Sequence, residues 1–356
     1  MKTKLKLKKT FIIYAPGVYT GGGLILLKSI INSFPKNIPL ILFLDKKVLN
    51  LFDFPKNSQI YSAKKSLFSR LFLEYKLFSI VKKNDTILTF TSLPPLFKLS
   101  GHVICYHQNS ILLQKTTHRI FSKKKELLFI IKRTFSYICK MNVQEYIVQT
   151  PSMKKNLKKF YGDRIKVRIL PFVSRSPVLN FKKKKDGFVY ISDGNDHKNH
   201  NNLLDAWSLL GKFKIKPKLF LTLDKNNKNL LSKINNLCLY ENLKINNLGQ
   251  VPHSKVFKIY ESSQALIFPS FYESFGLPLI EATQAKLPII ASDLEYVHDV
   301  CNPNEIFDPK SPYSIMLAVK RFLNKPQSKI KIIKKNFFIK VKTLNEKDFL
   351  KKLGIQ

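Results

Sequence analysis

Residues 265–282 read ALIFPSFYESFGLPLIEA, and this stretch decides the fold. Its first part, Ala265–Phe268, is a short apolar run of the kind that is buried on both faces in a parallel sheet. Pro278 predicts that a helix begins near Gly276, because proline fits the first helical turn, where its missing N–H would lack a partner anyway. A buried strand that leads into a helix predicts a parallel α/β architecture.

Similar apolar runs recur along the whole chain, with helical stretches between them. This alternation predicts an α/β fold made of two doubly wound, Rossmann-like domains that face each other across a cleft. The thirteen expected strands are Phe11–Ala15, Pro39–Leu44, Gln59–Tyr61, Thr86–Phe90, His102–His107, Glu145–Gln149, Val167–Leu170, Phe188–Ser192, Lys218–Leu223, Lys244–Leu248, Ala265–Phe268, Pro288–Ala291 and Glu305–Phe307.

The chain length also favours two domains. At 356 residues it is too long for one ordinary core, since a domain has roughly 150 residues. The polar, aperiodic stretch from Ser174 to Lys185 is the best linker candidate. We therefore expect domains at 1–175 and 176–335, followed by a helical tail at 336–356 that packs back on the first domain.

The composition is that of a globular protein, with 44% hydrophobic and 24% charged residues. The four cysteines lie far apart without metal-ligand spacing, which indicates a reducing cytosol and neither a zinc site nor a disulfide framework. The apolar run at Phe11–Ala15 follows five lysines but is too short for a signal peptide. No apolar stretch approaches the roughly 20 residues that span a bilayer, so no integral membrane protein is expected.

The formal net charge is +39, and most of the excess lies in the first half of the chain. Residues 1–180 hold 33 basic and 7 acidic groups, many of the basic ones in pairs and triplets such as Lys123-Lys124-Lys125. Such clusters attract anionic lipid or nucleic acid phosphates. Compositional drift in a chain rich in Lys, Asn, Ile and Phe explains the same excess without a function, and both interpretations stay open.

Groups that can bind a ligand lie where the expected helix begins. The backbone amides of Phe275, Gly276 and Leu277 point out of its N-terminus, where they and the helix dipole form an anion site. The two carboxylates that flank it, Glu273 and Glu281, would be repelled by an anion and are pure acceptors. Hydroxyl groups of a sugar and a ribose are therefore their natural partners.

The whole string resembles the signature P-S-x-x-E-S-F-G-L-P-x-x-E-A of retaining GT-B glycosyltransferases of family four, also called glycosyl transferases group 1. The resemblance implies that Glu273 contacts the transferred sugar as a catalytic residue and that Glu281 binds the ribose. It implies that the amides of Phe275, Gly276 and Leu277 hold the distal phosphate and that Ser274 also binds the donor. One departure is Lys286, where the family usually has glycine in a turn.

Other segments resemble further parts of that family. Asn195–His200 resembles the phosphate-binding loop, which implies a catalytic role for Lys198 on the diphosphate and donor binding by Asn195. The family commonly has an arginine where this chain has Asn195, so a clamp of two cations is in doubt. The turn Leu248–His253 resembles the base-binding turn, with backbone groups near Val251 reading the nucleobase.

The first half of the chain resembles the family more weakly. Gly22 and Gly23 belong to a glycine-rich loop that resembles the one with which the family lets donor phosphate approach, and a helix is expected from Leu24. Their spacing is not that of the dinucleotide fingerprint, so nicotinamide binding is not expected. His107 ends an expected strand, where α/β sheets place ligands, and family members often carry a catalytic histidine there.

The resemblance implies a retaining glycosyltransferase with an acceptor-binding first domain and a nucleotide-sugar-binding second domain. A UDP- or GDP-sugar is the expected donor, and a glycan or polyprenyl-diphosphate-linked chain of a cell-surface polysaccharide is the expected acceptor. No D-x-D motif occurs, so no metal and no cofactor are expected. The basic first half favours a cytoplasmic protein bound peripherally at the inner face of the membrane.

Two alternatives remain at this stage. A basic nucleic-acid-binding protein would explain the charge, but it calls for basic clusters interleaved with exposed aromatic residues, and the aromatic residues here mostly lie within apolar runs. A catalytically inactive GT-B scaffold would explain the missing arginine at Asn195.

Overall fold

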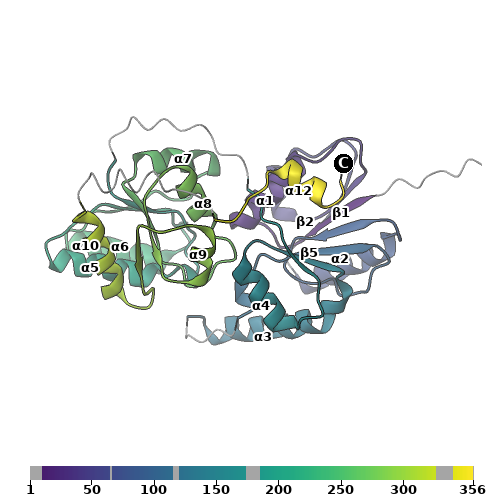
Figure 1. Cartoon of the computed structure of the whole chain (residues 1–356), viewed down its shortest axis with the longest axis horizontal. Coiled ribbons are helices and arrows are strands. Elements are labelled where there is room, and N and C mark those ends of the chain that lie inside the picture. The colour runs from purple at the N-terminus through teal and green to yellow at the C-terminus, as the bar shows by residue number, and fades with distance from the viewer. Residues whose placement is uncertain (1–9, 65, 115–119, 174–184, 326–339, 356) are drawn as a thin grey trace, which may run out of the picture. The chain divides into compact units, whose positions relative to one another are not determined.

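The computed structural model describes residues 10–64, 66–114, 120–173, 185–325 and 340–355. The chain divides into two compact units (Figure 1). Unit 1 comprises Met1–Thr117, Ser122–Ser174 and Thr343–Gln356, and unit 2 comprises His118–Phe121 and Arg175–Lys342. The expected linker, apart from its last residue, and the expected boundary at 335/336 lie outside the described residues.

Unit 1 contains a seven-stranded parallel sheet. Its order is β3 (Ser58–Ala63), β2 (Leu40–Asp45), β1 (Phe11–Ala15), β4 (Thr86–Thr89), β5 (His102–Tyr106), β6 (Glu145–Val148) and β7 (Val167–Ile169). The order reverses between β1 and β4, which pair in parallel. This is the topological switch point of a doubly wound fold, where the carboxyl ends of the strands leave room for a ligand.

Helices connect the strands of unit 1, and one more helix comes from the end of the chain. The connecting helices are α1 (Gly21–Asn32), α2 (Leu67–Ile80), α3 (Lys123–Ile138) and α4 (Pro151–Tyr161), with short 3-10 turns η1 (Lys46–Leu51), η2 (Ser110–Leu112) and η3 (Cys139–Asn142), and the last helix is α12 (Glu346–Lys352). Leu73 and Leu77 of α2 and Leu157 and Tyr161 of α4 belong to one core cluster with residues of the sheet. Both helices therefore cover the same face of the sheet.

Unit 2 contains a six-stranded parallel sheet in the order β10 (Ile245–Asn247), β9 (Leu219–Leu221), β8 (Phe188–Tyr190), β11 (Ala265–Phe268), β12 (Ile289–Ser292) and β13 (Glu305–Phe307). Its helices are η4 (Asp196–Lys198), α5 (His200–Lys212), α6 (Lys228–Tyr240), α7 (His253–Ser262), α8 (Leu277–Gln284), α9 (Glu295–Val300) and α10 (Pro312–Leu323). The switch point falls between β8 and β11, so residues 269–282, which follow β11, begin at the switch point.

The structure confirms two doubly wound α/β units, and each of the thirteen expected strands is present. β11, for example, is four residues long and wholly buried, as its unbroken apolar sequence requires. The four cysteines are free thiols. No helix in the described residues is long and apolar enough to cross a membrane.

One expectation was wrong. α1 begins at Gly21 and not near Leu24, so Gly22 and Gly23 lie in its first turn.

Not every aromatic residue of an apolar run is buried. In α2, Phe68, Phe72 and others are exposed. A helix that is apolar all round presents one face to the core and another to the surface, and an apolar run alone does not distinguish the two.

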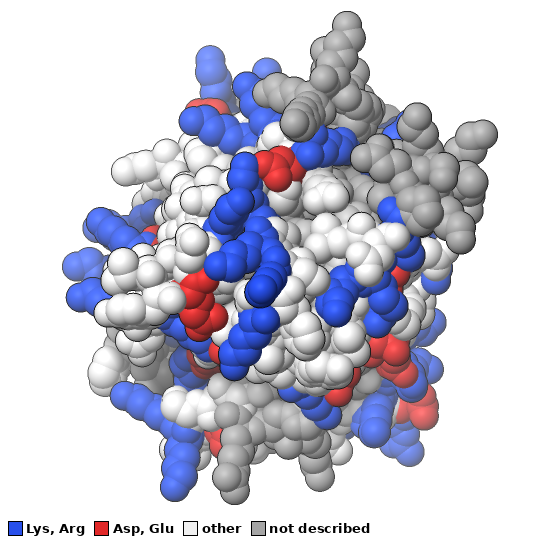
Figure 2. Space-filling model, turned by 90° about the vertical axis from the view of Figure 1, so that its left-hand side faces the viewer, with Lys and Arg blue, Asp and Glu red and all other residues white. Residues whose placement is uncertain are grey.

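Basic and acidic side chains are mixed on the face of the molecule drawn in Figure 2, where unit 2 carries α5, α6 and α10. Lys233 Nζ lies 2.6 Å from Asp205 Oδ1, and Arg321 Nε lies 2.7 Å from Glu305 Oε2. The excess charge of this face is therefore partly paired.

Candidate donor site

Two loops meet at the switch point of unit 2. One, residues 191–199, follows β8, and the other, residues 269–276, follows the neighbouring parallel strand β11. The amide of Phe271 donates to the carbonyl of His197 over 2.8 Å, which joins the loops directly. The sheet thus brings together two segments that lie far apart in the sequence.

Ser270 is a fully buried hub beneath these loops. The Tyr190 and Ser270 hydroxyl oxygens are 2.8 Å apart, and the Tyr190 hydroxyl also donates to the Lys198 carbonyl over 2.9 Å. The Ser270 carbonyl accepts from the Tyr296 hydroxyl at 2.8 Å and from the Ser292 hydroxyl at 3.1 Å. Buried hydrogen bonds of this kind fix loop positions, because breaking one leaves a desolvated polar group unpaired.

Asn199 holds the loop at residues 191–199 from its other end. Its backbone is left-handed at φ 61°, a conformation that asparagine adopts more readily than most residues. Its buried side-chain amide donates to the carbonyls of Pro269 and Pro309 at 3.0 and 2.7 Å. Asn199 therefore ends η4 and positions the preceding Lys198.

Lys198 and Glu273 form an ion pair in which Nζ and Oε1 are 2.6 Å apart. Both side chains are largely buried. Burial lowers the pKa of Lys198, but the neighbouring carboxylates of Glu273 and Asp193 outweigh it, and the net pKa is raised. The ammonium therefore stays charged and has three donors, so it can hold Glu273 and an incoming anion together.

The N-terminus of α8 lies directly after Glu273 in the chain. Gly276 caps the helix with a left-handed backbone at φ 68°, and a Cβ there would lie 3.0 Å from Leu279 Cδ1. Within the described residues, the amides of Phe275, Gly276 and Leu277 donate no hydrogen bond. These amides at a helix N-terminus can receive an anion, as the sequence predicts.

Glu281, in the second turn of α8, is buried and engaged by two side chains of α7. Its Oε1 lies 2.7 Å from His253 Nε2, and its Oε2 accepts from the Tyr260 hydroxyl at 3.1 Å. The hydrogen bond with Glu281 raises the pKa of His253. A carboxylate has about four acceptor positions, so Glu281 retains capacity for ribose hydroxyls.

The remaining predicted donor residues of unit 2 lie in exposed or half-buried loops. The side-chain amide of Asn195 donates to Asp193 Oδ2 over 2.7 Å and lies at the surface. Ser274 is half-buried between Glu273 and the α8 cap. Val251 lies in the turn between β10 and α7, two residues before His253. The His253–Glu281 contact joins that turn to α8, the helix whose N-terminal amides are open.

Unit 1 holds the other predicted site residues at the carboxyl edge of its own sheet. His107 directly follows β5 and is fully buried, and burial lowers the pKa of its ring to about 3, so the ring is neutral at pH 7. Within the described residues, neither ring nitrogen has a hydrogen-bond partner. Gly23 lies close to Gln108, the residue that follows His107, because a Cβ on Gly23 would lie 3.3 Å from Gln108 Oε1.

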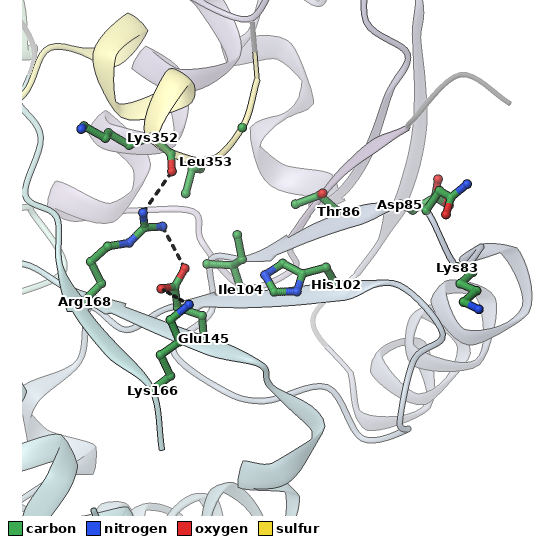
Figure 3. A pocket seen from close by; sticks show the side chains of 12 residues that line it. Lys83, Asp85, Thr86, His102, Ile104, Glu145, Lys166, Arg168, Lys352 and Leu353 are labelled. Carbon is green, nitrogen blue, oxygen red and sulfur yellow. Dashed lines mark hydrogen bonds and ion pairs between the residues drawn. The ribbon is translucent and has the colours of Figure 1, made fainter. Parts of the chain in front are cut away.

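A cavity of about 370 Å³ lies at the opposite, amino-terminal edge of the unit 1 sheet (Figure 3). Glu145 accepts from Arg168 over 2.8 Å in its wall, and Lys166 Nζ lies 3.5 Å from the same carboxylate. Arg168 also donates to the Lys352 carbonyl at 3.1 Å. These groups pair with one another except at Arg168 Nε, which has no hydrogen-bond partner within the described residues. None of the predicted site residues lines this cavity.

Sequence reasoning missed several residues of the donor site. His253 and Tyr260, which hold Glu281, and Asn199 and Ser270, which hold the loops, were given no role. His253 ends the turn that resembles the base-binding turn, but only tertiary contact relates it to Glu281. Within the described residues, no group of three or more His, Cys, Asp or Glu side chains is placed to hold a metal ion.

Two doubly wound parallel α/β units are the architecture of the GT-B class of protein folds. Sucrose-phosphate synthase from Thermosynechococcus elongatus superposes with a TM-score of 0.68 at 16% identity, covering 97% of this chain and 98% of that one. HepE from Anabaena, solved with UDP and glucose, gives 0.66 at 13% identity, covering 97% and 98%.

The model of the family Glycosyl transferases group 1 matches residues 152–337, more than half of the chain, and the chain belongs to this family. The O-antigen chain mannosyltransferase RfbU of Salmonella typhimurium is 25% identical over 211 residues. That match covers 56% of this chain and 58% of the relative, so the chain spans little more than half of that protein's length.

Proposed function

We propose that the chain transfers a hexosyl group from a nucleotide sugar to a growing cell-surface polysaccharide. Unit 2 binds the donor and unit 1 binds the acceptor. The observation that carries this proposal is the Lys198–Glu273 pair beside the open amides of α8. A cation and helix-terminal amides suit a diphosphate, and a carboxylate beside them suits sugar hydroxyls.

Mannose is the first candidate for the sugar, because the similar protein RfbU bears the name of an O-antigen chain mannosyltransferase. GDP-mannose is then the first donor to test, with UDP-sugars as the next. The acceptor is a glycan or a polyprenyl-diphosphate-linked chain. Such an acceptor would place the protein peripherally at the inner face of the cytoplasmic membrane.

The proposed reaction retains the anomeric configuration and uses no metal or cofactor. The bond between the anomeric carbon and the diphosphate breaks, and the acceptor oxygen bonds to the same face of that carbon. The acceptor proton passes to the departing phosphate oxygen. Lys198 and the α8 amides stabilise the developing charge on the diphosphate, and the lack of a D-x-D motif supports the metal-independent form.

Glu273 would orient the transferred sugar, and Lys198 would hold the Glu273 carboxylate in place. Glu281 would accept hydrogen bonds from the ribose hydroxyls. The backbone turn at Val251 would contact the base. In unit 1, the neutral ring of His107 would contact the transferred sugar. Gly22 and Gly23 would let the donor phosphate approach the backbone closely. Asn195 would complete the phosphate-binding loop.

The test is a donor-hydrolysis and transfer assay, read by intact mass, with GDP-mannose and a panel of UDP- and GDP-sugars. Lys198→Met should lower kcat by about 10²–10³-fold, as expected for one lost electrostatic group. Glu281→Ala should nearly abolish turnover, whereas the control Glu261→Ala, on the last turn of α7, should keep it. Wild-type rates in Glu281→Ala would refute the assignment.

A negative result has two distinct meanings in the same experiment. Nucleotide binding without turnover of any donor would favour a catalytically inactive scaffold. Tight, salt-dependent RNA binding without nucleotide-sugar binding would favour a nucleic-acid-binding protein.

A further inference from the structure

The outer face of α2 is apolar although it lies at the surface. Phe68, Leu71, Phe72, Tyr75 and Phe78 recur at helical spacing and are all exposed, Phe68 by 83% and Phe72 by 63%. The opposite face of the same helix carries the core residues Leu73 and Leu77. Helix α2 therefore has two apolar faces, and only one of them is buried in unit 1.

Helix α3 and the turn η3 also carry an exposed apolar face. Leu127, Ile130, Ile131, Ile138 and Met141 follow one exposed helical face, with Ile138 exposed by 73% and Met141 by 65%. Along α3 itself, Ser136 is the one buried residue within the described part of the chain. The apolar face of α3 thus points away from the core.

The loop around Phe97 joins these two faces. The rings of Phe78 and Phe97 are 5.3 Å apart, which connects α2 to this loop. The side-chain amide of Asn142 donates to the carbonyls of Pro95 and Leu96 at 3.0 Å each, which connects the loop to η3. Among the large apolar side chains exposed in the described residues, 13 of 21 lie on α2, α3, η3 or at Phe97.

Basic residues border this surface, which we call the α2/α3 surface. Residues 67–80 and 123–142 contain eight Lys and Arg residues but two acidic ones, Glu74 and Glu126. Glu74 is buried and accepts from the Tyr14 hydroxyl at 2.8 Å. The exposed lysines Lys123, Lys124 and Lys125 lie together at the N-terminus of α3, where the helix dipole does not compensate them.

We propose that the α2/α3 surface is the site at which this protein binds an anionic lipid bilayer. Amphipathic helices with an apolar face and a basic border lie in the interface of such bilayers. Contiguous exposed apolar patches of this kind mark interaction sites. This proposal rests on the proposed function and names the residues that would carry out its membrane association. A lipid-linked acceptor is the reason for the protein to associate with a membrane.

The charge and chemistry of the surface favour a bilayer over other occupants. A second copy of the chain would bring like-charged lysine clusters together, which costs free energy. Nucleic acid would need aromatic residues across the surface for base stacking. On the α3 half, Tyr137 is the one aromatic residue among the exposed large apolar side chains of the described residues, and the others are aliphatic. A bilayer with anionic headgroups accepts the aliphatic side chains and the lysines at once.

The test is cosedimentation of the full chain with vesicles of phosphatidylcholine alone and with one quarter phosphatidylglycerol, at low and at physiological salt. The double variant Phe72→Ser, Ile138→Ser should partition at least tenfold more weakly. The triple variant Lys123→Gln, Lys124→Gln, Lys125→Gln should lose about a hundredfold on anionic vesicles only, since each basic residue contributes roughly fivefold.

Leu239→Ser, Tyr240→Ser is the matched control, because these side chains are exposed by 73% and 79% on unit 2. This variant should bind vesicles as the wild type does. All replaced side chains are exposed, so unchanged melting temperatures will show that the variants fold. Failure of the wild type to bind anionic vesicles at low salt overturns the proposal, as does undiminished binding by the Phe72, Ile138 variant.

Two further readouts separate this proposal from others. A dimer that the Phe72, Ile138 variant abolishes, without vesicle binding, would assign the surface to a second copy and overturn the proposal. Donor hydrolysis measured without vesicles should be unchanged in that variant. Vesicle binding that behaves as expected in a protein that turns over no donor would uphold the surface and refute the proposed function.

Discussion

Glu281 and His253 show how a single residue acquires its role. The carboxylate of Glu281 is fixed by two side chains of α7. The sequence predicts only that Glu281 lies on α8 and does not show that α7 holds it. Lys198 and Glu273 are likewise 75 positions apart and meet at 2.6 Å. The residue types were predictable because each suits its chemistry, but the pairing depends on which loops the sheet brings together.

The His253–Glu281 pair predicts a pH dependence. The pKa of His253 is raised in the folded protein, so its stabilising effect is complete below the unfolded value near 6.5 and is lost as pH rises through the folded value. His253→Gln should therefore lower the melting temperature more at pH 6 than at pH 8.5. Thermal unfolding at a series of pH values measures this difference.

His298→Gln is the control for that experiment, because His298 pairs with Asp293 at the exposed surface and exposed pairs contribute little. It should change the melting temperature slightly at every pH. A His253→Gln effect that is constant or grows towards pH 8.5 would contradict the interpretation of the pair.

At the scale of the element, α8 illustrates how local sequence sets both ends of a helix. Gly276 caps its N-terminus and Pro278 lies in its first turn, as the sequence predicts. At its C-terminus Leu287 donates to the Ala282 carbonyl at 2.9 Å and Lys286 to the Thr283 carbonyl at 3.0 Å, which is the Schellman pattern. Lys286 takes the left-handed position at φ 46°, where this motif usually has glycine and the sequence shows a departure from its family.

Lys286→Gly should therefore stabilise the protein by roughly 1 kcal/mol, because glycine adopts this conformation without the steric cost of a Cβ. Lys286→Ala keeps the Cβ and should give no such gain, which separates the backbone effect from loss of the charge. Urea unfolding of the three proteins measures the difference. Equal stabilisation by both substitutions would show that charge, and not conformation, is decisive.

At the scale of the whole molecule, the end of the chain returns to the unit in which it began. Phe349 of α12 is fully buried, and its ring lies 4.2 Å from that of Phe172 and 5.6 Å from that of Tyr106. Glu346 accepts from the Ser29 hydroxyl over 2.7 Å. Residues 343–355 are thus part of the unit 1 core and not an appendage.

Phe349→Ala should destabilise unit 1 by about 3–5 kcal/mol, the usual cost of removing a buried ring. Lys347→Ala, on the exposed side of the same helix, is the control and should stay within about 0.5 kcal/mol. Calorimetry of the full chain would show the loss as a shift in one transition. No shift, or an equal shift in both variants, would contradict the placement of α12.

The sequence by itself determined the thirteen strands and the two doubly wound units, and it proposed the residues of the candidate donor site. Strand-forming apolar runs and helix caps are local patterns, so the sequence encodes them directly, as at Pro278 and Gly276. Tertiary structure alone decided that His253 and Tyr260 hold Glu281, that Phe349 completes unit 1, and that the second apolar face of α2 is exposed. Those outcomes depend on contacts between distant segments, and an apolar side chain carries no mark of which neighbour will bury it or leave it at the surface.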